Sequence, residues 1–288
     1  MIKSKFPIKK KGKKFIKNRD FILFTIIFII LVAVGISNPN FVTLKSLSDV
    51  LTDTSILIIL ALSQMIVILI RAIDLSVASN LALSGMLISL LSQIYPDLPL
   101  IFFILLSCGI GTLLGLFNGL VIAVLKVPFI VTTLGTLSIY RGLIYFVSDG
   151  KQVYSHEFSD SFLSFIHVRF LSLTSLFWFA VCVFIIIYIL LNYTKFGRNI
   201  YALGGNPEAA KYIGINENRY IIAAYVLSGF FAGLCGYLWV ARYSVASTQI
   251  AIGFELTVIS ACVVGGISVM GGLGTVTGCL LGALLIGL

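Results

Sequence analysis

Residues 21–36 read FILFTIIFIILVAVGI, an apolar run without a charged side chain that ends in Ser37-Asn38-Pro39-Asn40. An α-helix rises about 1.5 Å per residue and needs about 20 residues to cross a hydrocarbon core of about 30 Å. Several similar runs follow, and each must be helical because unpaired backbone groups are too costly in hydrocarbon. The predicted spans lie at about 21–37, 50–70, 73–94, 99–125, 129–147, 171–192, 220–241, 253–270 and 274–288.

The composition indicates the same fold class. The 288 residues are 59% apolar and 11% charged, which leaves too few polar groups for a water-facing surface. We therefore predict an all-α polytopic membrane protein, with a bundle of about eight to ten transmembrane helices in the complete protein. The last segment, 274–288, is short for a span and ends without a polar flank, so we expect the chain to be C-terminally incomplete.

Residues 1–20 form a basic tail. Nine Lys or Arg side chains stand against Asp20 alone, so the tail carries +8 of the formal net charge of +9. A basic tail beside an apolar helix keeps the N-terminus in the cytoplasm and favours contact with anionic membrane lipid. A cleaved signal peptide is disfavoured because no A-x-A-like site follows the long apolar run. No basic face interleaved with aromatic residues follows, so no nucleic-acid partner is expected.

Two polar loops differ in charge. Loop 193–219 holds more Lys and Arg than Asp and Glu, as cytoplasmic loops do, whereas loop 148–170 does not. Counting the predicted spans from a cytoplasmic N-terminus also puts loop 148–170 outside and loop 193–219 inside. The predicted layout is therefore a cytoplasmic tail of residues 1–20 and a transmembrane domain of residues 21–288 that contains loop 193–219.

Residues 206–214 of that loop, NPEAAKYIG, predict a short capped helix. Asn206 can cap the first turn, Pro207 suits the first helical position, and Glu208 favours the positive end of the helix dipole. Gly214 supplies a left-handed exit. Such a helix between two spans is either a lever for a soluble motor or an ordinary amphipathic connector.

The same residues resemble a known motif. Glu208-Ala209-Ala210 followed by Gly214 is similar to the EAA-x-x-x-G coupling loop of bacterial ABC importer permeases. Further stretches resemble the ribose-type sugar permease family, in order from about residue 40 to residue 288. They are Ile73–Val77 (IDLSV), Gly115–Gly119 (GLFNG), Val131–Thr136 (VTTLGT) with Arg141-Gly142, Tyr201–Asn206 (YALGGN), Gly253–Leu256 (GFEL), Val264–Ser268 (VGGIS) and Gly271–Gly274 (GGLG).

The resemblance implies the permease subunit of an ATP-binding-cassette importer in the cytoplasmic (inner) membrane of a bacterium. The implied partners are a second permease subunit, the same or homologous, a cytoplasmic ATP-binding subunit and an extracytoplasmic sugar-binding protein. No GxxxxGK[ST] sequence occurs, so we expect no cofactor on this chain and ATP on the partner subunit. The implied ATPase-coupling residues are Asn206, Pro207, Glu208, Ala209, Ala210 and Gly214.

Departures from the family pattern leave the solute open. The family often has Gly-Gly before Ile-Asp-Leu-Ser, where this chain has Arg71-Ala72, and Gly in place of Ala78. The run 133–142 (TLGTLSIYRG) resembles the rhamnose and autoinducer-2 branches more than the ribose branch. The expected solute is therefore a monosaccharide or sugar-like compound of the ribose, rhamnose or autoinducer-2 type.

Polar residues inside the apolar segments are candidates for a translocation path. An ionised group at mid-membrane costs about 2.5–3.5 kcal/mol or more, so it needs a partner or water. Asp74 and Glu255 are predicted to line the path together with Ser76 and Asn118. Arg141 is predicted to carry a structural charge, paired near the outer end of its span.

Several of these sequence features have alternative interpretations. Asp74 could form a helix-end pair with Arg71 at i,i+3. The glycines of 272–282 lack phosphate-loop spacing and predict a helix-packing face. An intramembrane protease with Ser84 as its nucleophile lacks a nearby base, because both histidines lie in the outer loop, and no metal site is expected. An ion-coupled secondary transporter of a small polar solute is the alternative function; it explains the membrane carboxylates but not the capped loop helix.

Overall fold

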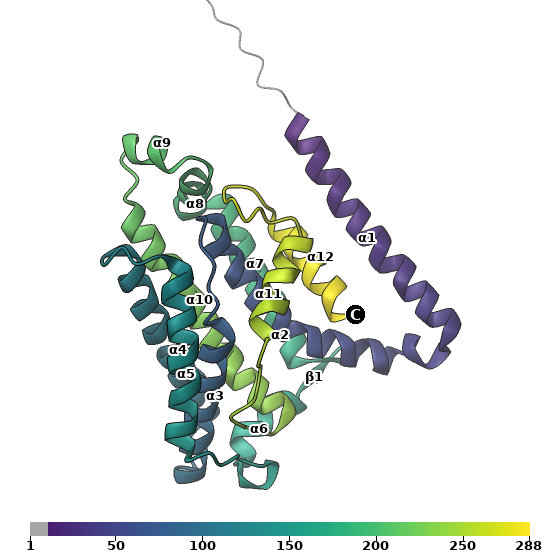
Figure 1. Cartoon of the computed structure of the whole chain (residues 1–288). Helices are drawn as coiled ribbons and strands as arrows, with labels where there is room; N and C mark the ends of the chain where they lie inside the picture. The colour runs from purple at the N-terminus through teal and green to yellow at the C-terminus, as the bar shows by residue number, and fades with distance from the viewer. Residues whose placement is uncertain (1–10) are drawn as a thin grey trace, which may run out of the picture.

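The computed structural model describes residues 11–288, so the first ten residues of the predicted basic tail lie outside the described range. Helices dominate this range (Figure 1). The long helices are α1 (Lys11–Ser37), α2 (Leu44–Leu69), α3 (Val77–Ile94), α4 (Leu100–Ala123), α5 (Phe129–Ser148), α7 (Ser175–Tyr193) and α10 (Glu217–Tyr243). The short elements are η1 (Pro39–Val42), η2 (Ser155–Glu157), α6 (Asp160–His167), β1 (Arg169–Phe170), β2 (Leu173–Thr174), α8 (Lys195–Gly205), α9 (Pro207–Tyr212), α11 (Phe254–Val264) and α12 (Val276–Gly287).

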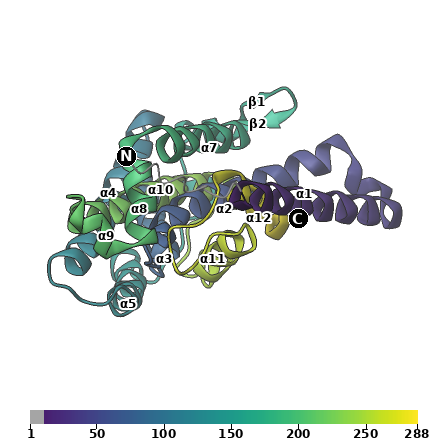
Figure 2. The same cartoon turned by 90° about the horizontal axis from the view of Figure 1, so that it is seen from above.

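Helix α2 is the centre of the bundle. Every residue from Thr54 to Leu69 is buried, and the helix packs against α7, α10, α11 and α12. Helices α3, α4, α5 and α10 pack together on one side, whereas α1 lies at the edge and exposes most of its apolar side chains (Figures 1 and 2). Seven of the described helices are long and apolar enough to cross a membrane, which confirms the predicted all-α polytopic class.

The prediction of continuous spans near the C-terminal end is wrong. Instead of one helix over 253–270, α11 covers only Phe254–Val264, and a non-helical turn joins it to the 12-residue α12. The turn is rich in glycine, and Gly266 and Gly272 have φ angles of 91° and 70°. Glycine weakens a helix by about 1 kcal/mol relative to alanine and adopts positive φ without strain. Hydropathy does not register this property, so the predicted break at 271–273 is shorter than the turn at 265–275.

A second break separates α2 from α3. The predicted span at 73–94 becomes helical only at Val77, because residues 70–76 return from the end of α2 as a non-helical segment. Arg71 has a φ of 66°, which no right-handed helix contains. Figure 1 shows this segment passing from the neighbourhood of α8 toward the start of α3. Both breaks therefore put backbone groups outside helices within the bundle, where other residues must satisfy them.

The turn between α11 and α12 is held to α1 by two charged residues. The Arg19 guanidinium donates to the carbonyls of Val263 and Val264 at 3.1 and 3.2 Å, at the end of α11. Asp20 accepts a hydrogen bond from Thr277 at 3.0 Å, in the first turn of α12. Each charge has the sign that its helix end favours. These contacts fix the first helix to an element almost 250 residues later in the sequence.

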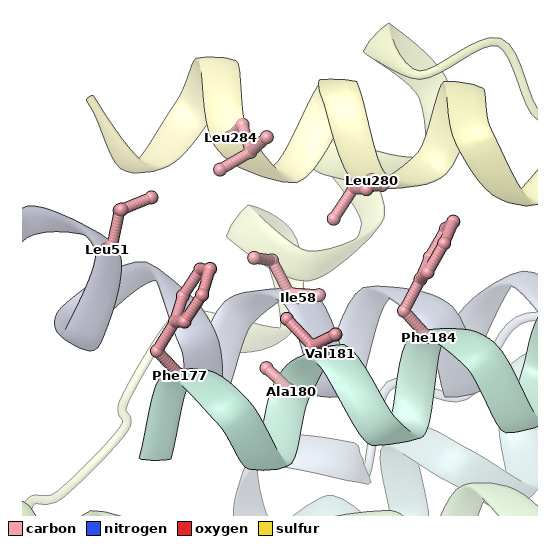
Figure 3. Close-up of a pocket in the computed structure, with 8 residues that line it drawn as sticks. All are labelled: Leu51, Ile58, Phe177, Ala180, Val181, Phe184, Leu280 and Leu284. Carbon is pink, nitrogen blue, oxygen red and sulfur yellow. The ribbon is translucent and has the colours of Figure 1, made fainter. Parts of the chain in front are cut away.

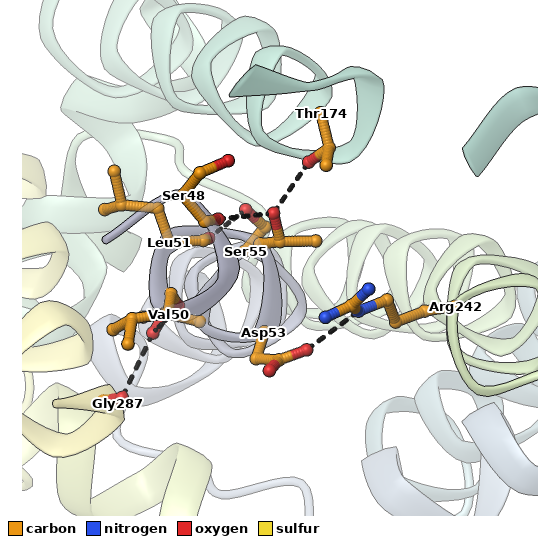
Figure 4. Close-up of polar contacts among 10 residues, drawn as sticks. Ser48, Val50, Leu51, Asp53, Ser55, Thr174, Arg242 and Gly287 are labelled. Carbon is orange, nitrogen blue, oxygen red and sulfur yellow. Dashed lines mark hydrogen bonds and ion pairs between the residues drawn. The ribbon is translucent and has the colours of Figure 1, made fainter. Parts of the chain in front are cut away.

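Polar contacts also fix the first half of α2 (Figure 4). Asp53 accepts a hydrogen bond from Arg242 of α10 at 2.9 Å, and Thr54 donates to the Gly287 carbonyl of α12 at 3.3 Å. The hydroxyls of Thr52 and Thr174 lie 2.8 Å apart, which joins α2 to β2. The central helix is thus tied to three neighbouring elements before it enters the apolar core.

Candidate functional site

The capped helix predicted in loop 193–219 is present as α9. Asn206 accepts a hydrogen bond from the Ala209 amide at 3.0 Å, Pro207 occupies the first turn, and Glu208 follows it. Gly214 has a φ of 83°, and its amide donates to the Lys211 carbonyl at 3.0 Å. The predicted local geometry is confirmed from the cap to the left-handed exit.

The outer face of α9 presents an apolar tip that the sequence pattern did not predict. Tyr212 is 91% exposed and Ile213 is 73% exposed, beside the exposed carboxylate of Glu208. The opposite face is packed, because Ala210 and Ile215 are buried. Large apolar side chains beside polar ones on a projecting element are typical of a protein contact surface.

Asp74 lies in the non-helical segment 70–76 and is 2% exposed. Its Oδ1 accepts hydrogen bonds from the Ser76 hydroxyl at 2.7 Å and from the Ser76 amide at 3.0 Å. Its Oδ2 accepts a hydrogen bond from Ser228 of α10 at 2.8 Å. Neither of the ion pairs among the described residues includes Asp74, so the alternative interpretation of a helix-end pair with Arg71 is not supported.

The Asp74 cluster extends to α4 and α5. The Asn118 side-chain amide donates to the Ser76 hydroxyl at 2.8 Å, so three predicted path residues meet in one buried network. The Ile73 carbonyl accepts hydrogen bonds from Tyr225 at 3.2 Å and from Thr133 at 3.5 Å. We refer to Asp74, Ser76, Asn118 and Ser228 as the Asp74 cluster. The cluster takes side chains from α4 and α10, and Thr133 of α5 adds a hydrogen bond to the Ile73 carbonyl. Polar groups of the non-helical backbone thus find partners within the bundle, as a membrane requires.

Glu255 and Arg141 belong to a different part of the bundle. The Arg141 guanidinium donates to the carbonyls of Ile250 and Ala251 at 2.7 and 2.9 Å, which joins α5 to the non-helical chain before α11. Glu255 lies in the first turn of α11 and is half-buried. Among the described residues, no hydrogen bond joins it to the Asp74 cluster. The structural role of Arg141 thus rests on two backbone carbonyls in place of a carboxylate.

An apolar cavity lies between α2, α7 and α12 (Figure 3). It has a volume of about 210 Å³, and its lining includes Leu51, Phe177, Phe184 and Leu284. All eight side chains drawn around it are hydrocarbon, so none can pair with a sugar hydroxyl. Burying an unpaired hydroxyl costs about 1–3 kcal/mol, which makes this cavity a poor site for a polar solute.

Comparison with known proteins assigns the family. Residues 46–288 match the model described as branched-chain amino acid transport system, permease component. The chain is 37% identical to the ribose import permease protein RbsC of Haemophilus influenzae, over 96% of this chain and 84% of that protein. It is 34% identical to the galactose/methyl galactoside import permease protein MglC of the same organism, over 93% and 86%.

A third relative belongs to a different named system. The chain is 36% identical to the autoinducer 2 import system permease protein LsrC of Klebsiella pneumoniae, over 94% of this chain and 78% of that protein. No solved structure matches the chain. The apolar helices, the capped loop helix and the match over 46–288 agree, and the chain belongs to the family of branched-chain amino acid transport system permease components, as a multi-pass membrane protein.

Proposed function

We propose that the chain is the membrane-spanning subunit of an ATP-binding-cassette importer that moves a monosaccharide or sugar-like solute across the cytoplasmic membrane. The observation that carries this proposal is the similarity over at least nine-tenths of the chain to permeases named for ribose, galactose and autoinducer 2 import. These names add galactose to the solutes expected from the sequence. They favour a sugar-like solute over an amino acid, although the family description names branched-chain amino acids.

The proposed partner at α9 is a cytoplasmic ATP-binding subunit. The support is geometric: Glu208, Tyr212 and Ile213 are exposed on a capped helix that projects from the bundle (Figure 1). ATP would be hydrolysed on that separate chain, and this chain would contribute movement alone. The similarity to sugar import permeases also supports a second permease subunit and an extracytoplasmic sugar-binding protein as partners in this proposal.

The ion-coupled alternative makes a different prediction about partners. A secondary transporter would need no soluble motor, and α9 would then be a connector. A tagged chain, coexpressed with the candidate ATPase and the partner permease of its transport system, is expected to copurify with that ATPase. Copurification that survives replacement of both Tyr212 and Ile213 by serine would contradict docking at α9.

The proposed translocation path runs along α5 and α11. Ser138 of α5 and Ser260 of α11 are exposed, and Glu255 lies half-buried on α11. Asp74, Ser76 and Asn118 are buried and hydrogen-bonded to one another, although Oδ1 of Asn118 has no partner among the described residues, so they would meet the solute only in a state in which segment 70–76 has moved. Cysteines at Ser138 and Ser260 should be protected from a thiol reagent by the transported solute. Equal labelling of both positions with and without solute would contradict this path.

The proposed orientation of the chain in the membrane rests on the charge of its loops and on the fold. Figure 1 places the start of α1 with α8 and α9 toward one end of the bundle, and α6 with β1 toward the other. The excess of Lys and Arg in loop 193–219 supports a cytoplasmic location for the α8–α9 end.

This orientation predicts opposite labelling of two exposed residues, Ser155 and Asn216. In a cysteine-free background, Ser155→Cys is expected to react with a membrane-impermeant thiol reagent on intact cells. Asn216→Cys is expected to react only after permeabilisation, which also shows that its thiol is reactive. Labelling of both from outside would contradict the orientation.

A further inference from the structure

Arg71 makes two hydrogen bonds that have no role in the proposed translocation path or in the proposed docking surface on α9. Its Nε donates to the Gly204 carbonyl at 2.7 Å, and its Nη2 donates to the Gly205 carbonyl at 2.9 Å. We propose that Arg71 is a positioning residue that couples the loop helices α8 and α9 to segment 70–76, so that movement of α9 reaches the Asp74 cluster. This inference rests on the proposed function, because it assigns the route by which docking at α9 would act on the membrane domain.

The chemistry of the contact favours a strong, directional link. Gly204 and Gly205 are the last residues of α8, where helix carbonyls lack partners within the helix and the dipole is negative. A guanidinium presents several N–H donors in a fixed plane and can bind two adjacent carbonyls at once. Asn206, the next residue, caps α9. The link from Arg71 therefore ends one residue before the cap of the helix that we propose as the docking element.

Backbone packing around this contact leaves α8 little freedom to slide. A Cβ atom on Gly204 would overlap the Leu69 carbonyl oxygen and lie 2.5 Å from the Gly272 amide nitrogen. The Gly272 amide donates to the Leu69 carbonyl at 2.9 Å, and the Tyr201 hydroxyl donates to the Gly274 carbonyl at 3.0 Å. The end of α2, the end of α8 and the turn between α11 and α12 thus meet backbone to backbone.

The inner end of the same segment is equally fixed. Asp74 stands three residues after Arg71 and is bound to Ser228 of α10, while the Ile73 carbonyl is bound by Tyr225 of α10. Segment 70–76 is therefore attached to α8 at one end and to α10 at the other. A movement of α8 and α9 relative to α10 would therefore strain this segment, together with the direct contact between Asn199 of α8 and Tyr220 of α10.

The backbone of Arg71 has a strained, left-handed conformation that an ordinary connecting segment would not need. A non-glycine residue at a φ of 66° is uncommon, and glycine adopts this conformation freely. Arg71→Gly would thus preserve the turn and relieve strain while removing the guanidinium. Because Arg71 is exposed, the change should leave membrane abundance near normal, so any loss of coupling is separable from misfolding.

The chain supplies a matched control. Lys126 is also basic, exposed and in a left-handed conformation, with a φ of 58°, and its ammonium donates to Asn218 at 2.6 Å. This contact joins the turn after α4 to the start of α10 and does not involve α8. Lys126→Gly therefore removes the same kind of charge and the same kind of strain without touching the proposed link.

The experiment compares Arg71→Gly, Arg71→Lys and Lys126→Gly in the complete reconstituted transporter. Solute transported per ATP hydrolysed should fall at least about fivefold in Arg71→Gly, the lower range of allosteric coupling. Lysine is a point charge that cannot reproduce the fork, so Arg71→Lys should lie between wild type and Arg71→Gly. Lys126→Gly should match wild type. The proposal would be overturned if the Arg71→Gly transporter moved as much solute per ATP hydrolysed as the Lys126→Gly transporter.

A second readout does not depend on transport. Amide hydrogen exchange in residues 69–76 and 271–274 should accelerate in Arg71→Gly and stay unchanged in Lys126→Gly. Unchanged exchange in Arg71→Gly would overturn the link even if transport fell. A wild-type chain that copurifies with no ATPase would refute the proposed function, and the exchange measurement would still decide whether Arg71 holds α8 to segment 70–76.

Discussion

Gly111→Ala is expected to push α4 and α10 apart at their closest approach, and to lower the free energy of unfolding by about 1–3 kcal/mol or more. A Cβ atom on Gly111 would overlap the Gly229 carbonyl and lie 2.6 Å from the Cα of Gly233. The obstacle is backbone, which cannot rotate away as a side chain can. Helices in membranes associate through close approach of this kind, since lipid supplies no hydrophobic drive between them. The measurement is the thermal midpoint in detergent, with abundance in the membrane.

The same helix provides the control for this prediction. Gly109 lies two residues earlier in α4, and no described atom lies within 4 Å of the Cβ position there. Gly109→Ala should keep or raise the thermal midpoint, because alanine favours a helix by up to about 1 kcal/mol over glycine. Equal midpoints for the two variants would show that the α4–α10 contact contributes little.

The long helices could be predicted from sequence, whereas the length of the two breaks between helices could not. Apolar runs of sufficient length identified seven spans because hydrocarbon forces every long apolar run into a helix. The same rule failed at 70–76 and 265–275, where polar side chains and neighbouring helices satisfy a non-helical backbone. The turn at Arg71 could not be predicted, since hydropathy does not depend on whether a single arginine adopts a left-handed conformation.

The site was predictable in part for a similar reason. Local chemistry identified α9, because Asn206, Pro207 and Gly214 determine its ends without help from distant residues. The Asp74 cluster needed tertiary structure: Ser228 lies more than 150 residues away, and a serine on an apolar helix is an ordinary feature. Tyr225 and Ser228 lie one turn apart on the same face of α10. This pair of hydroxyls is the sequence feature that indicates a polar neighbour for α10.

Changing both Glu208 and Gly214 is expected to uncouple transport from ATP hydrolysis through the geometry of α9. Removing the Glu208 charge should cost the helix only about 0.3–1 kcal/mol, so Glu208→Ala should leave assembly intact. Gly214 has open space around its Cβ position but a φ of 83°, so Gly214→Val is strained by its backbone alone and redirects the exit of α9. The double variant should insert and accumulate near normally while transport per ATP hydrolysed collapses.

Glu217→Ala is the matched control for the charge. Glu217 is an exposed acid in the first turn of α10, outside α9, and it should be replaceable without loss of transport. Reconstitution with the partner ATPase and binding protein gives both uptake and hydrolysis from one preparation. Full uptake by the Glu208→Ala, Gly214→Val double variant, with unaltered stimulation of the ATPase, would make α9 an ordinary connector.

The energy source of uptake distinguishes an ATP-driven importer from an ion-coupled transporter. Proteoliposomes that hold the chain with its partner permease, ATPase and binding protein are supplied with labelled ribose, galactose, rhamnose or autoinducer-2. We predict uptake of at least one of these solutes that requires ATP and the ATPase and persists when ionophores abolish all ion gradients. Uptake driven by a sodium or proton gradient in the absence of the ATPase would contradict the account.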